Sequence, residues 1–390
     1  MADSTEKKKP TTKPSPRSTM SIQTLLFVAL TVPVAVFVAL YNLDPFDPAP
    51  MPAHTTYTSV HVPVHFSAIV GRSERVADGL VHGPEDLAYD AGSGWLYTSC
   101  SDGWIRRVGL GGLDRPMVVE DWANVAGDGR ASRPLGIAFG PDGRLVIADA
   151  YRGLLKVTED RKVDLLTDEA EGVKFRLTDG VDVASDGTIY FTDASYKYSL
   201  HEHMEDVLGA RPHGRLMSFD PTTGETRVLV RDLYFANGVV VSPDQDLVLY
   251  CETLLRRCMK YHIKGEKKET VEVFIDNIPG FPDNIRHDGE GKYWIGLATG
   301  RTLFWDIILK YPFLRKILVI MSRYVELPDG QQDGGVLEVD LEGRPVALYT
   351  DPGLGETTVG LKIGNQLYYG SLLKSYISRM ELPQSSTSAK

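Results

Sequence analysis

The stretch LTDGVDVASDGTIYFTDA, residues 177–194, decides the fold because five other segments of the chain repeat its pattern. Each copy has a run of alternating apolar residues, a turn built from Asp, Gly or Asn, and a second run rich in aromatic and β-branched residues. This pattern is typical of a β-hairpin. The other copies are GPEDLAYDAGSGWLYTSC (83–100), RPLGIAFGPDGRLVIADA (133–150), FANGVVVSPDQDLVLYCE (235–252), FPDNIRHDGEGKYWIGLA (281–298) and TTVGLKIGNQLYYGSLLK (357–374).

The spacing of the copies predicts the architecture. Most neighbouring copies begin between 44 and 58 residues apart, which is the length of a four-stranded propeller blade. Six copies therefore predict an all-β fold, a six-bladed β-propeller over residues 59–384. The last interval is longer because residues 301–330 carry apolar positions at helical spacing. We interpret them as a helical insertion before the last blade, packed on the propeller; a lid or membrane-contacting element is the alternative.

The composition is that of a globular protein and excludes some partners. The chain has 390 residues, of which 43% are hydrophobic and 24% charged, with a net charge of -10. An acidic chain with no basic stripe outside its extreme N-terminus repels phosphate backbones, so we expect no nucleic-acid partner. The oligomeric state is left open.

The N-terminus predicts a membrane anchor. Residues 1–20 are rich in Lys, Pro, Ser and Thr and predict a disordered cytosolic tail, whereas residues 21–41 are nearly all apolar and long enough to cross a bilayer. Charged residues flank the segment asymmetrically: Lys7, Lys8, Lys9, Lys13 and Arg17 before it, Asp44 and Asp47 after it. By the positive-inside rule, the N-terminus is then cytosolic and the propeller lies in a lumen or outside the cell. We expect the endoplasmic reticulum or the vacuole, and the sequence leaves the cell surface open as the final destination.

Other features of the ends complete this prediction. A cleavable signal peptide is the alternative for residues 21–41, but its apolar core is usually shorter. Residues 42–58 are rich in Pro and predict a stiff spacer, and residues 385–390 predict a short disordered tail.

The repeats place one residue of each copy at an equivalent position, just before the first strand, where propeller loops converge on the central channel. This column reads Glu85, Leu135, Asp179, Asn237, Asp283 and Val359, with Asp86 and Asn284 one residue later in their copies. Oxygen ligands that converge without Cys or His suit Ca²⁺. Any one of them alone fits a structural turn. Together, they predict a calcium site whose ligands are Glu85, Asp179, Asn237, Asp283 and Asn284.

Other polar residues have simpler interpretations. Asp142, Asp186 and Asp288 lie in the Asp-Gly turns, and Asp149 and Asp193 follow second strands, so we interpret all five as structural.

Two histidines and three cysteines remain. We interpret the segment with His201 and His203 as a solvated loop, with a place over the channel mouth as the alternative. Cys251 and Cys258 are near enough to pair across a hairpin, and the spacing leaves both the bridged and the free state open. Cys100 is then free and buried.

Several motifs carry a family resemblance. LTDGVDVASDGTIYFTDASYKY, FANGVVVSPD and GFPDNIRHDG resemble the strictosidine synthase-like proteins of plants and the adipocyte plasma membrane-associated proteins of animals. More distantly the chain is similar to the paraoxonases and gluconolactonases, six-bladed propellers with a channel calcium. The resemblance implies that Glu85, Asn237 and the pair Asp283–Asn284 are calcium ligands. Asp179 stands where those hydrolases usually have Asn, which adds a negative charge.

The resemblance also implies a reaction. The catalytic glutamate of strictosidine synthase falls near Val359, and Val cannot move a proton, so that condensation is not expected unless Glu356 reaches the site. The related hydrolases imply an arylesterase- or lactonase-like enzyme acting on a small ester or lactone, with Glu85, Asp179 or Asp283 as the base. A propeller that binds a metabolite, lipid or protein without catalysis, and holds a structural calcium, is the alternative; a condensing enzyme is the second alternative.

Overall fold

The computed structural model describes residues 21–55, 57–110, 117–325 and 332–383. The predicted tails, residues 1–20 and 385–390, lie outside these ranges. The chain divides into two compact units, Met1–Pro45 and Phe46–Lys390. In the first unit the helix α1 (Ile22–Leu43) begins at Ser21, whose hydroxyl accepts a hydrogen bond from the Thr24 N–H. This helix is long and apolar enough to cross a membrane, and a signal sequence would share these properties.

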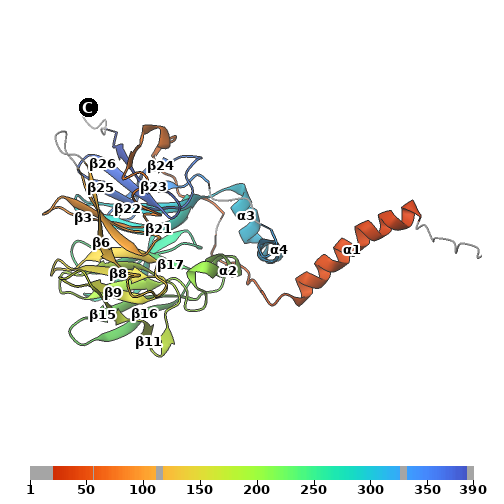
Figure 1. Cartoon of the computed structure of the whole chain (residues 1–390), viewed down its shortest axis with the longest axis horizontal. Helices are drawn as coiled ribbons and strands as arrows, with labels where there is room; N and C mark the ends of the chain where they lie inside the picture. Colours follow the sequence, from red (N-terminus) through yellow and green to blue (C-terminus); the bar gives the residue numbers. More distant parts are fainter. Residues whose placement is uncertain (1–20, 56, 111–116, 326–331, 384–390) are drawn as a thin grey trace, which may run out of the picture. The chain divides into compact units, whose positions relative to one another are not determined.

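The second unit is a six-bladed β-propeller, as predicted (Figure 1). Each of the first four blades is an antiparallel sheet whose strands follow the chain from the channel outwards. The first four blades are β3 (Leu87–Asp90), β4 (Trp95–Ser99), β5 (Trp104–Gly109) and β6 (Val118–Asn124); β7 (Pro134–Phe139), β8 (Leu145–Asp149), β9 (Gly153–Val157) and β10 (Val163–Thr167); β13 (Thr178–Val183), β14 (Ile189–Asp193), β15 (Gly214–Asp220) and β16 (Glu225–Leu233); and β17 (Ala236–Val241), β18 (Leu247–Glu252), β19 (Arg257–His262) and β20 (Val271–Ile275). A separate hairpin is formed by β11 (Glu169–Ala170) and β12 (Val173–Lys174).

The last two blades take strands from the beginning of the propeller unit. The fifth consists of β21 (Gly280–His287), β22 (Lys292–Gly300), β23 (Gly335–Asp340) and β24 (Pro345–Thr350), with β1 (Val64–Phe66) parallel to β24. The sixth consists of β25 (Thr357–Ile363), β26 (Gln366–Ser371), β27 (Ile377–Glu381) and β2 (Glu74–Val76). Because β2 pairs with β27, the first and last parts of the propeller share one sheet, and this pairing closes the ring.

The innermost strands approach one another so closely that glycine is required. Gly136, Gly180 and Gly238 each directly follow a residue of the predicted channel column. A Cβ atom on Gly180 would lie 2.7 Å from the carbonyl oxygen of Asn237, and one on Gly238 would lie 2.5 Å from the Cα atom of Asn284. Neighbouring inner strands therefore pack backbone against backbone, and the column residues converge.

A β-bulge marks the same position in most blades. The first strand shifts register near its start in blades two to six, for example between Thr178 and Val181 and between Ala236 and Val239. An extra residue at this point re-aims one side chain out of the regular alternation. The bulges therefore turn the column residues toward the channel.

The five aspartates that we interpreted as structural make the hydrogen bonds expected of turn and loop residues. Asp142, Asp186 and Asp288 each accept a hydrogen bond from the backbone N–H two residues later, as a turn aspartate does. Asp149 and Asp193 accept backbone N–H bonds in the loops around their strands.

The helical insertion lies within the fifth blade, between β22 and β23, rather than between blades. It contains α3 (Leu303–Lys310) and α4 (Pro312–Ser322), and a further pair of short helices, η2 (Leu200–Glu202) and α2 (His203–Gly209), follows β14. A 3₁₀ turn, η1 (Val70–Arg72), precedes β2. One face of α3 and α4 packs into a hydrophobic cluster with α2, so the packed interpretation is correct for that face.

The segment after α1 is also part of this cluster. Phe46 is buried in it, and Arg315 of α4 donates hydrogen bonds to the carbonyl oxygens of Leu208 (2.9 Å) and Ala49 (2.5 Å). Residues 46–49 therefore pack on the propeller unit rather than standing free as a spacer.

The cysteine question is resolved in favour of a bridge. Cys251 and Cys258 form a disulfide across the directly paired positions of β18 and β19. Cys100 is free and buried, as predicted.

The crowding of the inner strands makes a testable prediction. We expect Gly238→Ala to destabilise the protein by about 1–3 kcal/mol, because the added methyl overlaps the backbone of the next blade. Gly71→Ala is the matched control, since nothing lies within 4 Å of its added Cβ. Urea unfolding of both variants measures the difference, and equal midpoints would contradict this account of the channel.

Candidate metal centre and cavity

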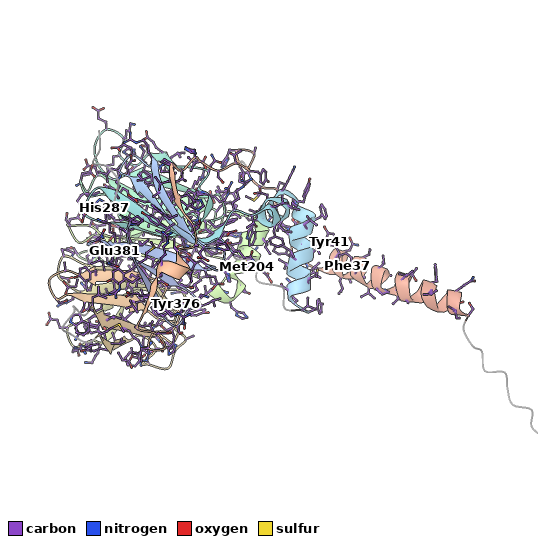
Figure 2. All side chains as sticks on the ribbon, turned by 90° about the horizontal axis from the view of Figure 1, so that it is seen from above. Phe37, Tyr41, Met204, His287, Tyr376 and Glu381 are labelled. Atoms are coloured by element: carbon purple, nitrogen blue, oxygen red, sulfur yellow. A yellow bond between two sulfur atoms is a disulfide. The ribbon has the colours of Figure 1, made fainter. Side chains whose placement is uncertain are left out.

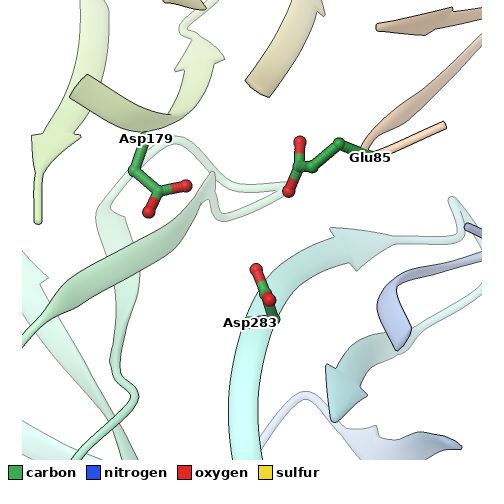
Figure 3. A group of neighbouring side chains, drawn as sticks. All are labelled: Glu85, Asp179 and Asp283. Atoms are coloured by element: carbon green, nitrogen blue, oxygen red, sulfur yellow. The ribbon is translucent and has the colours of Figure 1, made fainter. Parts of the chain in front are cut away.

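Three carboxylates from alternate blades meet at one end of the channel. Glu85 precedes β3, Asp179 lies at the start of β13, and Asp283 lies in β21 (Figure 3). Each offers a carboxylate oxygen within 4.8 Å of the others, and the three residues are only 2%, 5% and 6% exposed. The repeat column thus brings Glu85, Asp179 and Asp283 close together.

Burial and mutual repulsion disfavour the ionised form of these three carboxylates. Burial, followed by the charges of Asp86, Asp283 and Asp179, raises the pKa of Glu85 well above its usual value. Burial, followed by the charge of Asp179, does the same to the pKa of Asp283. Burial, followed by the charge of Asp86, raises the pKa of Asp179 to about 8. A bound cation would favour the ionised form of all three.

Two buried oxygen atoms beside the cluster are without hydrogen-bond partners among the described residues. They are Oε2 of Glu85 and Oδ1 of Asn237, and both residues line the same cavity. A buried acceptor without a partner is costly, and a hard cation bound by oxygen would satisfy it. The donor set, with Asp179 and Asp283, therefore fits a Ca²⁺ ion.

Asn284 has a different contact from the other predicted ligands. Its Nδ2 donates a hydrogen bond of 2.7 Å to Oε1 of Glu85. Asn284 therefore orients Glu85 and leaves Oε2 of that carboxylate for another partner.

Hydroxyl groups on adjacent strands hold the backbone around the cluster. The Thr192 hydroxyl donates to the carbonyl oxygen of Asn237 (2.7 Å) and accepts from the Gly180 N–H (2.9 Å). The Thr358 hydroxyl likewise donates to the carbonyl oxygen of Glu85. Each hydroxyl joins one blade to the next at the residue that carries a candidate ligand.

Asp86, which neighbours Glu85, faces another partner. It forms a buried ion pair with Arg286, whose Nε lies 3.2 Å from Oδ1 of Asp86. Asp86 also accepts a hydrogen bond from the Ile137 N–H (2.8 Å), and Arg286 donates to the Ile137 carbonyl oxygen (3.0 Å). The pair links the first, second and fifth blades, so Asp86 has a structural role.

A cavity of about 300 Å³ lies over the carboxylate cluster. Its polar part contains the column residues, and its wall is largely apolar, with side chains contributed by η2, α2 and α3. The lining residues include Leu135, Leu177, Leu200, His203, Met204, Val207, Phe235, Phe281, Trp305 and Leu373.

His203 corrects the sequence interpretation. It is not in a solvated loop but lines the cavity, with Nδ1 2.8 Å from the Leu200 carbonyl oxygen. Burial lowers its pKa. The η2 turn before it is fixed by a capping box of Ser199 and Glu202, whereas His201 is exposed.

Val359 and Glu356, both near the start of the sixth blade, have different environments. Val359 is fully buried in the hydrophobic cluster between the sixth and first blades, as a core residue. Glu356 instead lines the cavity, so a carboxylate of this blade does reach the site.

Arg133 is a functional candidate that the sequence analysis missed. It is 6% exposed, lines the cavity, and donates from Nη2 to the Gly83 carbonyl oxygen (3.0 Å). Its Nη1 has no hydrogen-bond partner among the described residues. The sequence signal was a charged residue two positions before the column in the second repeat, which no hairpin requires.

Comparisons with known proteins agree with this geometry. The family described as strictosidine synthase matches residues 179–266, and its strictosidine synthase-like N-terminal family matches residues 71–108. The chain is 50% identical to strictosidine synthase-like protein 6 of Arabidopsis thaliana over 92% of this chain and 95% of that protein. It is 31% identical to the human adipocyte plasma membrane-associated protein, over 92% and 89%.

Two solved structures show the same fold. A gluconolactonase from Xanthomonas campestris superposes with a TM-score of 0.56 at 16% identity, covering 87% of this chain and 99% of that chain. A calcium-binding regucalcin from Agrobacterium tumefaciens superposes with a TM-score of 0.55 at 16% identity, covering 82% and 96%.

The raised pKa values predict how stability depends on pH and calcium. A carboxyl group whose folded pKa is raised stabilises the metal-free protein below about pH 4, its unfolded pKa, and this contribution is lost as the pH rises through the folded pKa. For Asp179 that value is about 8. We therefore expect the melting temperature in chelator to fall between about pH 5 and pH 8.

Calcium should reverse this trend. Because the cation binds the ionised carboxylates, it should raise the melting temperature most at the upper end of that range. Calorimetric scans with calcium or with chelator, at several pH values, measure both effects. A melt that calcium leaves unchanged at every pH would contradict a metal centre here.

Proposed function

The chain belongs to the strictosidine synthase-like family, and on that premise we propose that it is a calcium-dependent hydrolase of small ester or lactone substrates. One observation carries the proposal: three buried carboxylates and the Asn237 amide converge at the floor of a ligand-sized, apolar-walled cavity, and two of their oxygen atoms have no hydrogen-bond partner among the described residues. Metal-assisted hydrolysis needs this combination of a cation site and an adjoining substrate pocket.

The donor set favours Ca²⁺ over other cations. Glu85, Asn237 and Asp283 supply only carboxylate and amide oxygens, which are hard ligands. Thiolates and imidazoles, which Zn²⁺ prefers, are not among the residues of the carboxylate cluster.

The residues divide into two roles. Glu85, Asn237 and Asp283 hold the cation, and Asn284 fixes the orientation of Glu85. When bound, the cation polarises the substrate carbonyl and stabilises the developing oxyanion. Asp179 takes the proton from the attacking water, since its side chain lines the cavity and its pKa is raised to about 8 in the metal-free protein.

The cavity defines the kind of substrate. About 300 Å³ accommodates a small organic molecule, and its apolar wall favours an aryl or alkyl group. Arg133 supplies a cationic donor at the same cavity for a substrate oxygen. The name of the gluconolactonase neighbour supports lactone hydrolysis, and that of the regucalcin neighbour supports calcium.

We further propose that α1 is an uncleaved anchor that places the propeller in the lumen of the endoplasmic reticulum or the vacuole. The length and apolar composition of α1 support this, as does the word membrane in the name of the human relative. The Cys251–Cys258 disulfide is typical of an oxidising compartment.

A second candidate function rests on Glu356. A glutamate from the sixth blade lines the cavity, so the acid/base group of a condensation of an amine with an aldehyde has a candidate even though Val359 is buried. Loss of a condensation activity in Glu356→Gln, with ester hydrolysis retained, would establish this alternative.

Two substitutions separate the proposed roles. Asp179→Asn removes the proposed base but leaves the three proposed ligands in place, so calcium should still bind while kcat for ester or lactone hydrolysis falls by about 10²–10⁴-fold. Asp283→Asn removes a charged ligand, so calcium affinity and turnover should fall together. Titration calorimetry and a panel of aryl esters and lactones measure these effects.

The outcomes separate the candidate functions. Stoichiometric calcium with no turnover by the wild type across the panel would favour a propeller that binds a ligand without catalysis. Turnover that survives in both variants and in chelator would overturn the assigned residues.

A further inference from the structure

The helical insertion carries an unusual exposed surface. Between α3 and the residues that follow α4, eight large apolar side chains are exposed, and Leu303 reaches 75%. Monomeric proteins rarely expose so many large apolar side chains on one short segment. We call these residues the insertion surface: Leu303, Phe304, Ile307, Tyr311, Phe313, Met321, Tyr324 and Val325.

The propeller does not need this surface for its own packing. Other side chains of the two helices, Trp305, Ile308 and Val319, already pack in the cluster shared with α2. A helix that is apolar on both faces requires a second apolar environment. We therefore expect the insertion surface to contact an apolar partner other than the propeller blades.

We propose that this partner is a lipid bilayer, the one that α1 enters. The argument comes from the covalent chain. α1 ends at Leu43, and Phe46, three residues later, is buried in the same cluster as Trp305 and Ile308. Three residues span at most about 11 Å, whatever the orientation of the helix. If α1 spans a bilayer, its end and the cluster beneath the insertion surface cannot separate.

The polar residues of the helical insertion are also those expected beside a lipid bilayer. Lys310 is exposed at the end of α3 and lies 5.5 Å from the centre of the Tyr311 ring. Residues 303–325 contain one acidic residue, Asp306, against four basic ones, although the whole chain is acidic; of these four, Arg315 is buried and Arg323 pairs with Glu205. Tyr side chains and basic residues are typical of the zone where a protein meets phospholipid headgroups.

This surface adjoins the cavity. Trp305 of α3 and Met204 of α2 both line the cavity, while Phe304, the neighbour of Trp305, lies on the insertion surface. Met204 is labelled in Figure 2. Ligands that partition into the bilayer would then reach the cavity from the lipid. That consequence rests on the proposed hydrolase function, whereas the lipid contact rests only on the proposal that α1 is a membrane anchor.

The test uses the full chain in lipid nanodiscs that contain phosphatidylcholine and phosphatidylserine. Phe304→Cys places a fluorescent label on the insertion surface, and Leu341→Cys is the matched control, because these side chains are 45% and 46% exposed. Leu341 follows β23, at the end of the fifth blade opposite the insertion. The natural cysteines are buried or bridged, so each label has one site.

We expect spin-labelled lipids to quench most of the fluorescence at position 304 and little of it at position 341. Equal, weak quenching at both positions would overturn the proposal. Leu303→Cys provides a second probe in case the first variant fails to fold.

A second copy of the chain is the other occupant to exclude. If the label at position 304 resists lipid quenching but cross-links to another copy, the surface is a protein interface and the proposal is wrong. Because quenching requires neither calcium nor turnover, failure of the hydrolase proposal leaves this result unchanged.

Discussion

The close approach of six inner strands around one channel is the constraint on which the rest of the structure depends. It requires glycine after the column residues of the second, third and fourth blades, where the backbone of one blade lies against that of the next. Thr192 and Thr358 can therefore bridge neighbouring blades with single hydroxyl groups. The same convergence brings Glu85, Asp179 and Asp283 together in a buried place, where burial and mutual repulsion oppose their ionisation. The fold thus creates an electrostatic strain that a cation is suited to relieve.

The parts that could be predicted from the sequence are those in which a local pattern repeats. A blade is a local succession of strands, so alternation and turn residues revealed its existence, and the alignment of the copies revealed the channel column. Positions that depend on packing between distant segments were not accessible in this way. His203 and Glu356 reach the cavity through the placement of loops, and no periodicity shows that Arg133 would lie beside Glu85. The Cys251–Cys258 bridge required the strand register, which spacing alone does not determine.

Glu85 and Asp86 show why residue type alone is insufficient. They are adjacent, acidic and almost fully buried, yet Glu85 faces the cluster, whereas Asp86 pairs with Arg286 and binds the backbone of the second blade. A buried carboxylate with a complete set of donors is structural, whereas one with an oxygen lacking a partner is available to a ligand. The distinction lies in the hydrogen-bond pattern, which only the three-dimensional structure supplies.

The helices α2, α3 and α4 and the segment that follows α1 are far apart in the sequence but pack together, and Arg315 connects them. Arg315 is fully buried in α4 and donates to both α2 and the segment that follows α1, so burial of its charge is offset by backbone acceptors from two directions. Burial lowers its pKa to about 10, which still leaves the guanidinium charged at neutral pH. One side chain thus ties the chain leaving α1 to the helices that wall the cavity.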